Sequence, residues 1–147
     1  MIRFRPPRVA MLFAGLAGVA DWLLRGRLQL SLPRPGVGWL LGAAGFLIMM
    51  RGWWLFKDAR VAICPTAATA RLVTHGIYRV SRNPMYLGLA LMMAGLAVGI
   101  GTFPFYAAVA AYFFVIDRVF CRHEEAKLSA RFGEEYLTYT RRVRRWL

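Results

Sequence analysis

The residues best suited to chemistry lie between positions 71 and 88, where the polar and aromatic stretch RLVTHGIYRVSRNPMYLG separates two strongly apolar halves. Asn83 followed by Pro84 predicts a helix start, because Asn can accept hydrogen bonds from free backbone N–H groups and Pro is favoured at the first helical position. The positive dipole end of that helix would face a loop that carries Tyr78 and Arg82. Two interpretations stay open: a binding site for a carboxylate or phosphate, or a capped membrane helix beside an ordinary basic loop.

A second group of ionisable residues follows the last apolar run. Glu124 and Glu125 are adjacent acids in an otherwise basic region, so we expect a cationic partner, either on a ligand or among the surrounding arginines. Arg118 and Arg122 could orient a carboxylate on a substrate. An amine substrate would instead need a proton acceptor, for which the candidates are His75, His123 and Asp117.

The composition indicates an integral membrane protein with one domain over residues 1–147. Hydrophobic residues make up 59% of the chain, and the mean hydropathy of +0.44 is also high for a soluble domain. The net charge is +13, but the positive residues lie at the edges of apolar runs, which favours anionic lipids over nucleic acid as the counter-charge. Cys64 and Cys121 lie far apart without a His/Cys cluster, so neither a disulfide framework nor a metal site is predicted.

The apolar runs predict an all-α fold with four transmembrane helices, at about residues 9–24, 37–56, 84–101 and 103–120. Only Gly101 and Thr102 separate the last two helices, so these should form a tight antiparallel hairpin. Small-residue faces at Gly38-x-x-x-Gly42 and Gly95-x-x-x-Gly99 favour close helix contact. Most Lys and Arg residues lie in the N-terminal segment, the second loop and the C-terminal tail. We therefore expect a multi-pass protein of the inner or plasma membrane with both termini in the cytoplasm.

Residues 121–147 form the expected cytosolic tail. Its apolar residues recur at the spacing of an amphipathic helix, and Gly133 is expected to divide it in two; these apolar residues are Leu128, Phe132, Tyr136 and Tyr139. The arginines near its end, Arg141, Arg142, Arg144 and Arg145, suit an anionic membrane surface.

The stretch RLVTHGIYRVSRNPMYLG, the hairpin and then EEAKLSARFGEEYLTYTRRVRRWL together resemble the family of isoprenylcysteine carboxyl methyltransferases and phospholipid methyltransferases. The resemblance covers roughly the C-terminal half of the chain. It implies S-adenosylmethionine as methyl donor, bound at the cytosolic face between the first motif and the glutamate pair. The positions that it implies for donor binding are Ala70, Arg71, Leu72, Val73, Tyr78, Asn83, Pro84, Met85, Tyr86 and Glu124.

The chemistry of the residues is compatible with that donor. Its carboxylate suits the helix start at Asn83 and the Arg82 side chain, and its ammonium suits Glu124, with Glu125 as a neighbour or support. Tyr78 and Tyr86 could face the sulfonium of the donor or stack on its adenine. Methyl transfer is an in-line displacement that needs alignment and water exclusion more than acid–base groups.

The methyl acceptor is expected to be lipid-borne or apolar, with a carboxylate or amine headgroup. Its chain would lie along the fourth span, at positions that include Tyr112, Phe113 and Phe120. The alternatives are a noncatalytic membrane subunit and a lipid-binding scaffold, which would explain the spans and the basic tail without a donor site.

Overall fold

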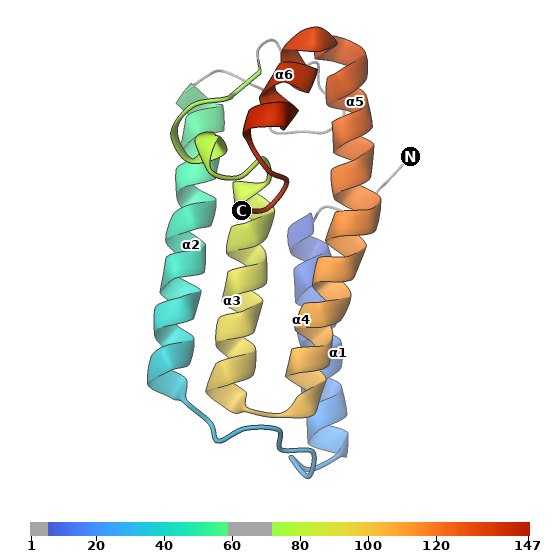
Figure 1. Ribbon diagram of the computed structural model, residues 1–147. Helices are drawn as coiled ribbons and strands as arrows, with labels where there is room; N and C mark the ends of the chain where they lie inside the picture. Colours follow the sequence, from blue (N-terminus) through green and yellow to red (C-terminus); the bar gives the residue numbers. More distant parts are fainter. Residues whose placement is uncertain (1–5, 59–71) are drawn as a thin grey trace.

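The computed structural model describes residues 6–58 and 72–147, and within these residues the fold is all-α, as predicted. Four helices lie side by side and alternate in direction (Figure 1): α1 (Pro6–Leu23), α2 (Pro35–Asp58), α3 (Pro84–Ile100) and α4 (Phe103–Val115). A π-helical turn at Ile116–Cys121 joins α4 to α5 (Arg122–Phe132), and Gly133 separates α5 from α6 (Glu134–Arg142). A 3-10 turn, Gly76–Arg79, precedes α3.

Local signals define both ends of α3. Pro84 occupies the first turn, and the helix ends at Gly101, whose φ of 83° is in the left-handed region that favours glycine. The Gly101 carbonyl accepts backbone hydrogen bonds from Leu30 and Ser31 at 2.9 and 3.0 Å. The expected two-residue connection between α3 and α4 is therefore present, and it is also bonded to the loop that joins α1 to α2.

The expected small-residue faces pack against each other, because α2 and α3 contact along their length. A Cβ atom added at Gly45 would lie 2.5 Å from the Gly88 carbonyl oxygen, and one added at Gly38 would lie 2.5 Å from the Gly95 carbonyl oxygen. Only glycine permits this backbone approach. Gly42 lies in the same helix, but a Cβ added there would meet no atom within 4 Å.

Gly45→Ala is therefore expected to destabilise the protein by about 1–3 kcal/mol, because the new methyl group would force α2 and α3 apart. Gly42→Ala is the matched control, and it should leave stability unchanged or slightly raised, since Ala is the better helix former. Reversible unfolding of both variants in one detergent measures the difference. Equal stability would contradict the close α2–α3 packing.

The helix that begins at Phe103 continues beyond residue 120, the expected end of the fourth membrane span. It runs through the π-helical turn to Phe132 without an interruption. The expected end of the span was placed where the apolar run stops, and it stays a prediction. Charged residues do not end a helix, and the first glycine after α4 is Gly133.

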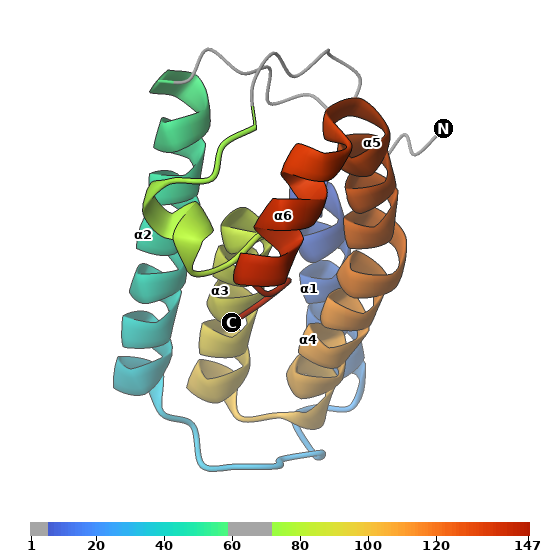
Figure 2. The same ribbon diagram turned by 45° about the horizontal axis from the view of Figure 1, so that its top comes forward.

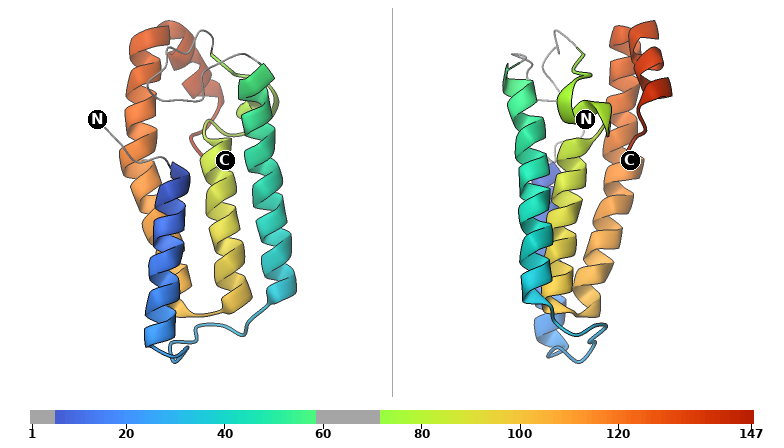
Figure 3. Two further views of the ribbon diagram at one scale, coloured as in Figure 1. Left: turned by 180° about the vertical axis from the view of Figure 1, so that it is seen from behind. Right: turned by 60° about the vertical axis from the view of Figure 1, so that its left-hand side comes forward.

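Within residues 6–58 and 72–147, two helices are long and apolar enough to cross a membrane, namely Pro35–Lys57 and Phe103–Phe132. Helix α3 is apolar but has 17 residues, which gives about 26 Å against a hydrocarbon thickness of about 30 Å. The expected first span is a helix, α1, that packs on α4 (Figure 3). A count of four spans stays a prediction.

The outward side of α2 is strongly apolar. Trp39 is 79% exposed, and Leu40 and Leu47 are 73% and 66% exposed. A water-soluble protein rarely presents apolar side chains in this density, so these residues indicate apolar surroundings. Polar groups instead gather at one end of the bundle, where residues 72–83, α5, α6 and the C-terminal residues meet (Figure 2).

Candidate functional site

The candidate site begins with a contact between α3 and α5. Tyr86, in the first turn of α3, donates a hydrogen bond from its hydroxyl to Oε1 of Glu124, in the first turn of α5. Both side chains are partly buried. The bond holds one carboxylate in a fixed orientation beside the start of α3.

Tyr78, in the 3-10 turn before α3, is only 5% exposed. Its ring packs edge-on against Phe56, with 5.3 Å between the centroids, and its carbonyl oxygen accepts a hydrogen bond from the Tyr139 hydroxyl at 2.7 Å. Burial raises the pKa of Tyr78, and the charge of the Glu124 carboxylate adds to the rise. Burial likewise raises the pKa of Tyr139 to about 12. Both phenols therefore stay protonated at neutral pH.

The loop before α3 is bonded to the C-terminal residues. Asn83 stands at the helix start as predicted, but its side chain does not cap the helix. Its Nδ2 donates instead to the Arg145 carbonyl oxygen at 3.2 Å, which also accepts from the Ser81 hydroxyl at 3.3 Å. The Arg82 backbone N–H donates to the Arg144 carbonyl oxygen at 3.1 Å. The C-terminal segment, Val143–Leu147, thus lies along residues 81–83.

Glu125 is held by two arginines. Arg145 donates from Nε and Nη2 to its two carboxylate oxygens at 2.9 and 2.6 Å, and Arg82 Nη1 lies 3.1 Å from Oε1. Arg82 also donates to the Tyr136 hydroxyl at 3.2 Å. Arg82, which was expected to suit the donor carboxylate, and Glu125, which was expected to be a neighbour or support of Glu124, are therefore paired with each other.

Arg145 also reaches Asp117, in the π-helical turn. Its Nη1 donates to Oδ1 of Asp117 at 3.0 Å, and the Trp146 indole N–H donates to the same oxygen at 2.9 Å. The Trp146 ring packs against Phe113 with 4.5 Å between centroids. Hydrogen bonds to Glu125 and then to Asp117 raise the pKa of Arg145, so it stays charged. The expectation that Arg145 faces lipid headgroups was wrong, because its guanidinium is hydrogen-bonded to the carboxylates of Glu125 and Asp117.

The other expected site residues are less closely grouped. Leu72 packs on the cluster of Tyr136 and Tyr139, while Val73 is buried beside Leu55 and Tyr78. Pro84 is fully buried, and the Met85 side chain points to Gly52 on α2. Arg118 and Arg122 are exposed on the α4–α5 helix, along with His75 on the loop and His123 on α5. Arg71 and Ala70 lie outside the described residues, as does Cys64.

Two residues of this network, Trp146 and Arg145, are not individually predicted as part of the site from the sequence. One signal could have helped: Asp117 and Glu125 are eight residues apart, which places them on the same side of a helix. Two acids on the same side of a helix favour a cation that pairs with both. Nothing in the sequence says that the cation is Arg145.

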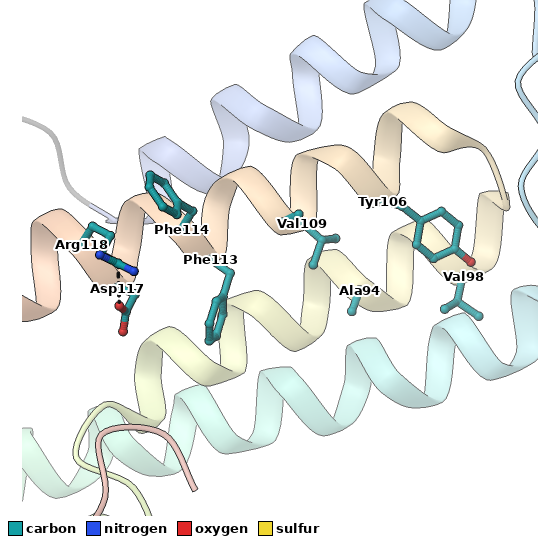
Figure 4. Close-up of a pocket in the computed structure, with 9 residues that line it drawn as sticks. Ala94, Val98, Tyr106, Val109, Phe113, Phe114, Asp117 and Arg118 are labelled. Carbon is teal, nitrogen blue, oxygen red and sulfur yellow. Dashed lines mark ion pairs between the residues drawn. The ribbon is translucent and has the colours of Figure 1, made fainter.

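A groove lies between α3 and α4, with a volume of about 600 Å³ (Figure 4). Its lining is mostly apolar, and the residues are Ala94, Val98, Tyr106, Val109, Ala110, Phe113, Phe114, Asp117 and Arg118. Phe113 was expected to lie along an acceptor chain. Tyr112 and Phe120, which were expected beside it, are instead buried in the core at 1% and 7% exposure.

Among residues 6–58 and 72–147, no group of three or more His, Cys, Asp or Glu side chains could hold a metal ion. Four ionisable residues of this end, Arg82, Asp117, Glu125 and Arg145, instead form ion pairs with one another.

Comparison with known proteins adds an independent observation. The model of a family described as phospholipid methyltransferase matches residues 34–135. A protein of Haemophilus influenzae, described only as uncharacterized, is 35% identical over 63 residues, which are 43% of this chain and 100% of that protein. No solved structure matches the chain. The family match includes Tyr78, Tyr86 and Glu124 but ends before Arg145.

Proposed function

Since the chain belongs to the phospholipid methyltransferase family, we propose that it is a membrane-embedded enzyme that transfers a methyl group from S-adenosylmethionine to a lipid-borne or strongly apolar acceptor. The observation that carries the proposal is the hydrogen bond from Tyr86 to Glu124, which fixes a carboxylate beside the start of α3. Both residues lie within the part of the chain that matches the family.

Glu124 is the carboxylate best suited to the donor ammonium. Asp117 and Glu125 are each paired with Arg145, whereas Glu124 has no arginine partner among the described residues. Burial raises the pKa of Glu124, while the hydrogen bond from Tyr86 and the charge of Lys127, one turn along α5, oppose the rise. A carboxylate already oriented by a phenol can bind an ammonium through a charge-assisted hydrogen bond without first being reordered.

The start of α3 would bind the donor carboxylate through its backbone N–H groups and its dipole. The Arg82 side chain already contacts Glu125 and Tyr136. It would therefore add to the positive potential of the loop rather than bond directly to the donor carboxylate. Tyr78 offers a buried aromatic ring. An aromatic face attracts a sulfonium, and a buried site excludes water. Leu72, Val73, Asn83, Pro84 and Met85 would shape this space, and Arg71 belongs to the same proposal.

Bound S-adenosylmethionine would supply a methyl group on a positively charged sulfur. The chain's own residues would hold the ammonium and the carboxylate, keep water away and leave one direction open to the acceptor. Arg118, exposed at the end of the groove, and Arg122, exposed at the start of α5, would orient an anionic group on the acceptor. A noncatalytic subunit or lipid scaffold would need neither Glu124 nor Tyr86.

We further infer a topology of four spans with both termini cytoplasmic. The alternating directions of α1 to α4 leave the N-terminal end of α1 and the C-terminal residues at the same end of the bundle (Figures 1 and 3). Arg79, Arg82 and the arginines of the tail are also there. The loop at the other end between α1 and α2 carries three arginines, and Gly101-Thr102 carries none.

The proposal is tested by titrating S-adenosylmethionine, and separately its demethylated product, into the purified full-length protein in detergent. We expect saturable binding of one molecule per chain by calorimetry. A related nucleoside without the amino-acid part, such as methylthioadenosine, should bind more weakly because it lacks the ammonium and carboxylate. Absence of binding by both the donor and its product would contradict the proposal and favour a noncatalytic membrane subunit.

A further inference from the structure

Arg145 links three parts of the chain that are distant in sequence. Its backbone carbonyl oxygen accepts hydrogen bonds from the Asn83 side chain at 3.2 Å and from the Ser81 hydroxyl at 3.3 Å, in the loop before α3. Its guanidinium donates to Glu125 on α5 at 2.9 and 2.6 Å, and to Asp117 in the π-helical turn at 3.0 Å. One residue therefore joins the loop, α5 and the π-helical turn.

These contacts fall directly beside the two groups proposed to bind the amino-acid part of the donor. Asn83 immediately precedes α3, whose first N–H groups would bind the donor carboxylate. Glu125 immediately follows Glu124, which would bind the donor ammonium. In S-adenosylmethionine the carboxylate and the ammonium are attached to the same carbon atom. The two binding groups must therefore be held at one separation, and Arg145 contacts the neighbour of each.

Direct packing of α5 on α3 contributes little to that separation. Helix α5 packs mainly on the π-helical turn and on α6. The start of α5 is instead joined to this region by the Tyr86–Glu124 hydrogen bond and by the Glu125 carboxylate. Glu125 forms ion pairs with Arg82 and Arg145. A single hydrogen bond leaves both side chains free to turn, whereas the paired bonds from the Arg145 guanidinium fix the carboxylate in position and orientation.

The network around Arg145 is shielded enough from water to hold this geometry. The side chains of Arg145, Glu125 and Asp117 are each between 19% and 28% exposed. The Trp146 indole also donates a hydrogen bond to Asp117 at 2.9 Å. Ion pairs that are largely buried are screened less by salt than exposed ones. Such a network can also serve the fold alone, so a role in the site must be visible in donor binding itself.

We propose that Arg145 is a positioning residue of the donor site. Through Glu125, its guanidinium holds Glu124 at the distance from the start of α3 that the amino-acid part of S-adenosylmethionine requires, without touching the donor. The proposal rests on the proposed function, because it concerns the same site. It goes beyond the family match, which ends at residue 135.

A double-mutant cycle with Glu124→Gln tests this role. The probe is S-adenosylhomocysteine, the demethylated donor, titrated by calorimetry into the full-length protein in detergent. We expect Arg145→Ala to weaken binding about tenfold in the parent protein but about twofold or less in Glu124→Gln, because the position of residue 124 matters most while it carries the charge. Equal factors in the two backgrounds would overturn the proposal, since Arg145 would then not act through Glu124.

Two variants control for general effects. Arg144→Ala removes the same charge from an exposed neighbour and should leave the affinity unchanged. Gly38→Ala should lower stability, because a Cβ there would lie 2.5 Å from the Gly95 carbonyl oxygen, at the end of the bundle remote from the donor site (Figure 1). It should not change the affinity either. A loss of affinity in Gly38→Ala as large as in Arg145→Ala would overturn the proposal, because lower stability alone would then explain it.

Arg145→Lys keeps the cycle measurable if Arg145→Ala does not fold. Lysine keeps the charge but cannot form the paired bonds, so we expect a loss of about threefold in the parent protein and none in Glu124→Gln. A parent protein that binds the probe but gives additive losses would overturn only the present inference. A parent protein that binds neither S-adenosylmethionine nor the probe would overturn the proposed function, and the role of Arg145 with it.

Discussion

Glu124→Gln is expected to weaken the binding of S-adenosylmethionine by about ten- to a hundredfold. The substitution keeps the size of the side chain and an acceptor for the Tyr86 hydroxyl, but it removes the negative charge opposite the donor ammonium. A hydrogen bond to a charged group contributes about 1.5–3 kcal/mol, and the expected factor follows from that range. Calorimetric titration of the variant in the detergent used for the parent protein measures it.

Glu135→Gln is the control for this change. Glu135 lies on α6 and is exposed, so the same loss of charge there should leave donor affinity unaltered. Tyr86→Phe should give a smaller loss, of about fivefold, because it removes only the hydroxyl that orients Glu124. Equal affinity of Glu124→Gln and the parent protein would remove Glu124 from the site.

Arg145→Ala is expected to destabilise the protein by about 1.5–3 kcal/mol. The substitution removes the two bonds to Glu125 and the bond to Asp117, and it leaves two carboxylates with fewer partners. Arg145 is 28% exposed at its side chain, so solvent screening keeps the effect below that of a fully buried pair. Unfolding in detergent, followed by the loss of helical signal, measures the change.

Arg144→Ala provides the matched comparison, because it removes the same charge from the neighbouring residue. The Arg144 side chain is exposed, and its backbone carbonyl, which accepts from Arg82, is kept in the variant. If the C-terminal arginines served only as contacts to anionic lipid, the two variants would behave alike. Arg145→Lys should recover part of the lost stability, since Lys keeps the charge but cannot make the paired bonds.

Local signals in the sequence predicted much of the fold. Pro84 and Gly101 fix the ends of α3 because one sets φ for a first helical turn and the other adopts a positive φ. The glycine spacings on α2 and α3 indicated close contact, and those two helices do pack on each other. These features depend on residues near one another in the chain, which is why periodicity and turn chemistry can identify them.

The faces of α4 could not be predicted in the same way. Tyr112 and Phe113 are neighbours of similar character, yet one is buried in the core and the other lines the groove. Their difference depends on the direction in which α4 packs against α1 and α3. The π-helical turn at Ile116–Cys121 also changes the direction of the side chains within it, so an α-helical period carried into the turn assigns Phe120 to the wrong side.

Long-range ion pairs were the other feature that could not be predicted from the sequence. Nothing in RRVRRWL distinguishes Arg145 from Arg144, and the partners of Arg145 lie 20 and 28 residues earlier. The pairing is determined by how the C-terminal segment folds against residues 81–83. Tyr86 and Glu124 were placed in one site by resemblance to a family, and their spacing of 38 residues alone would not have done so.

The most direct test of the central claim is transfer of a labelled methyl group. Purified full-length protein in liposomes of mixed bacterial lipids is incubated with S-adenosylmethionine that carries a radioactive methyl, and the organic-solvent extract is counted. We expect label in an extractable lipid product, dependent on the protein and strongly reduced in Glu124→Gln but not in Glu135→Gln. Donor binding without any label in the extract, or equal label with both variants, would contradict it.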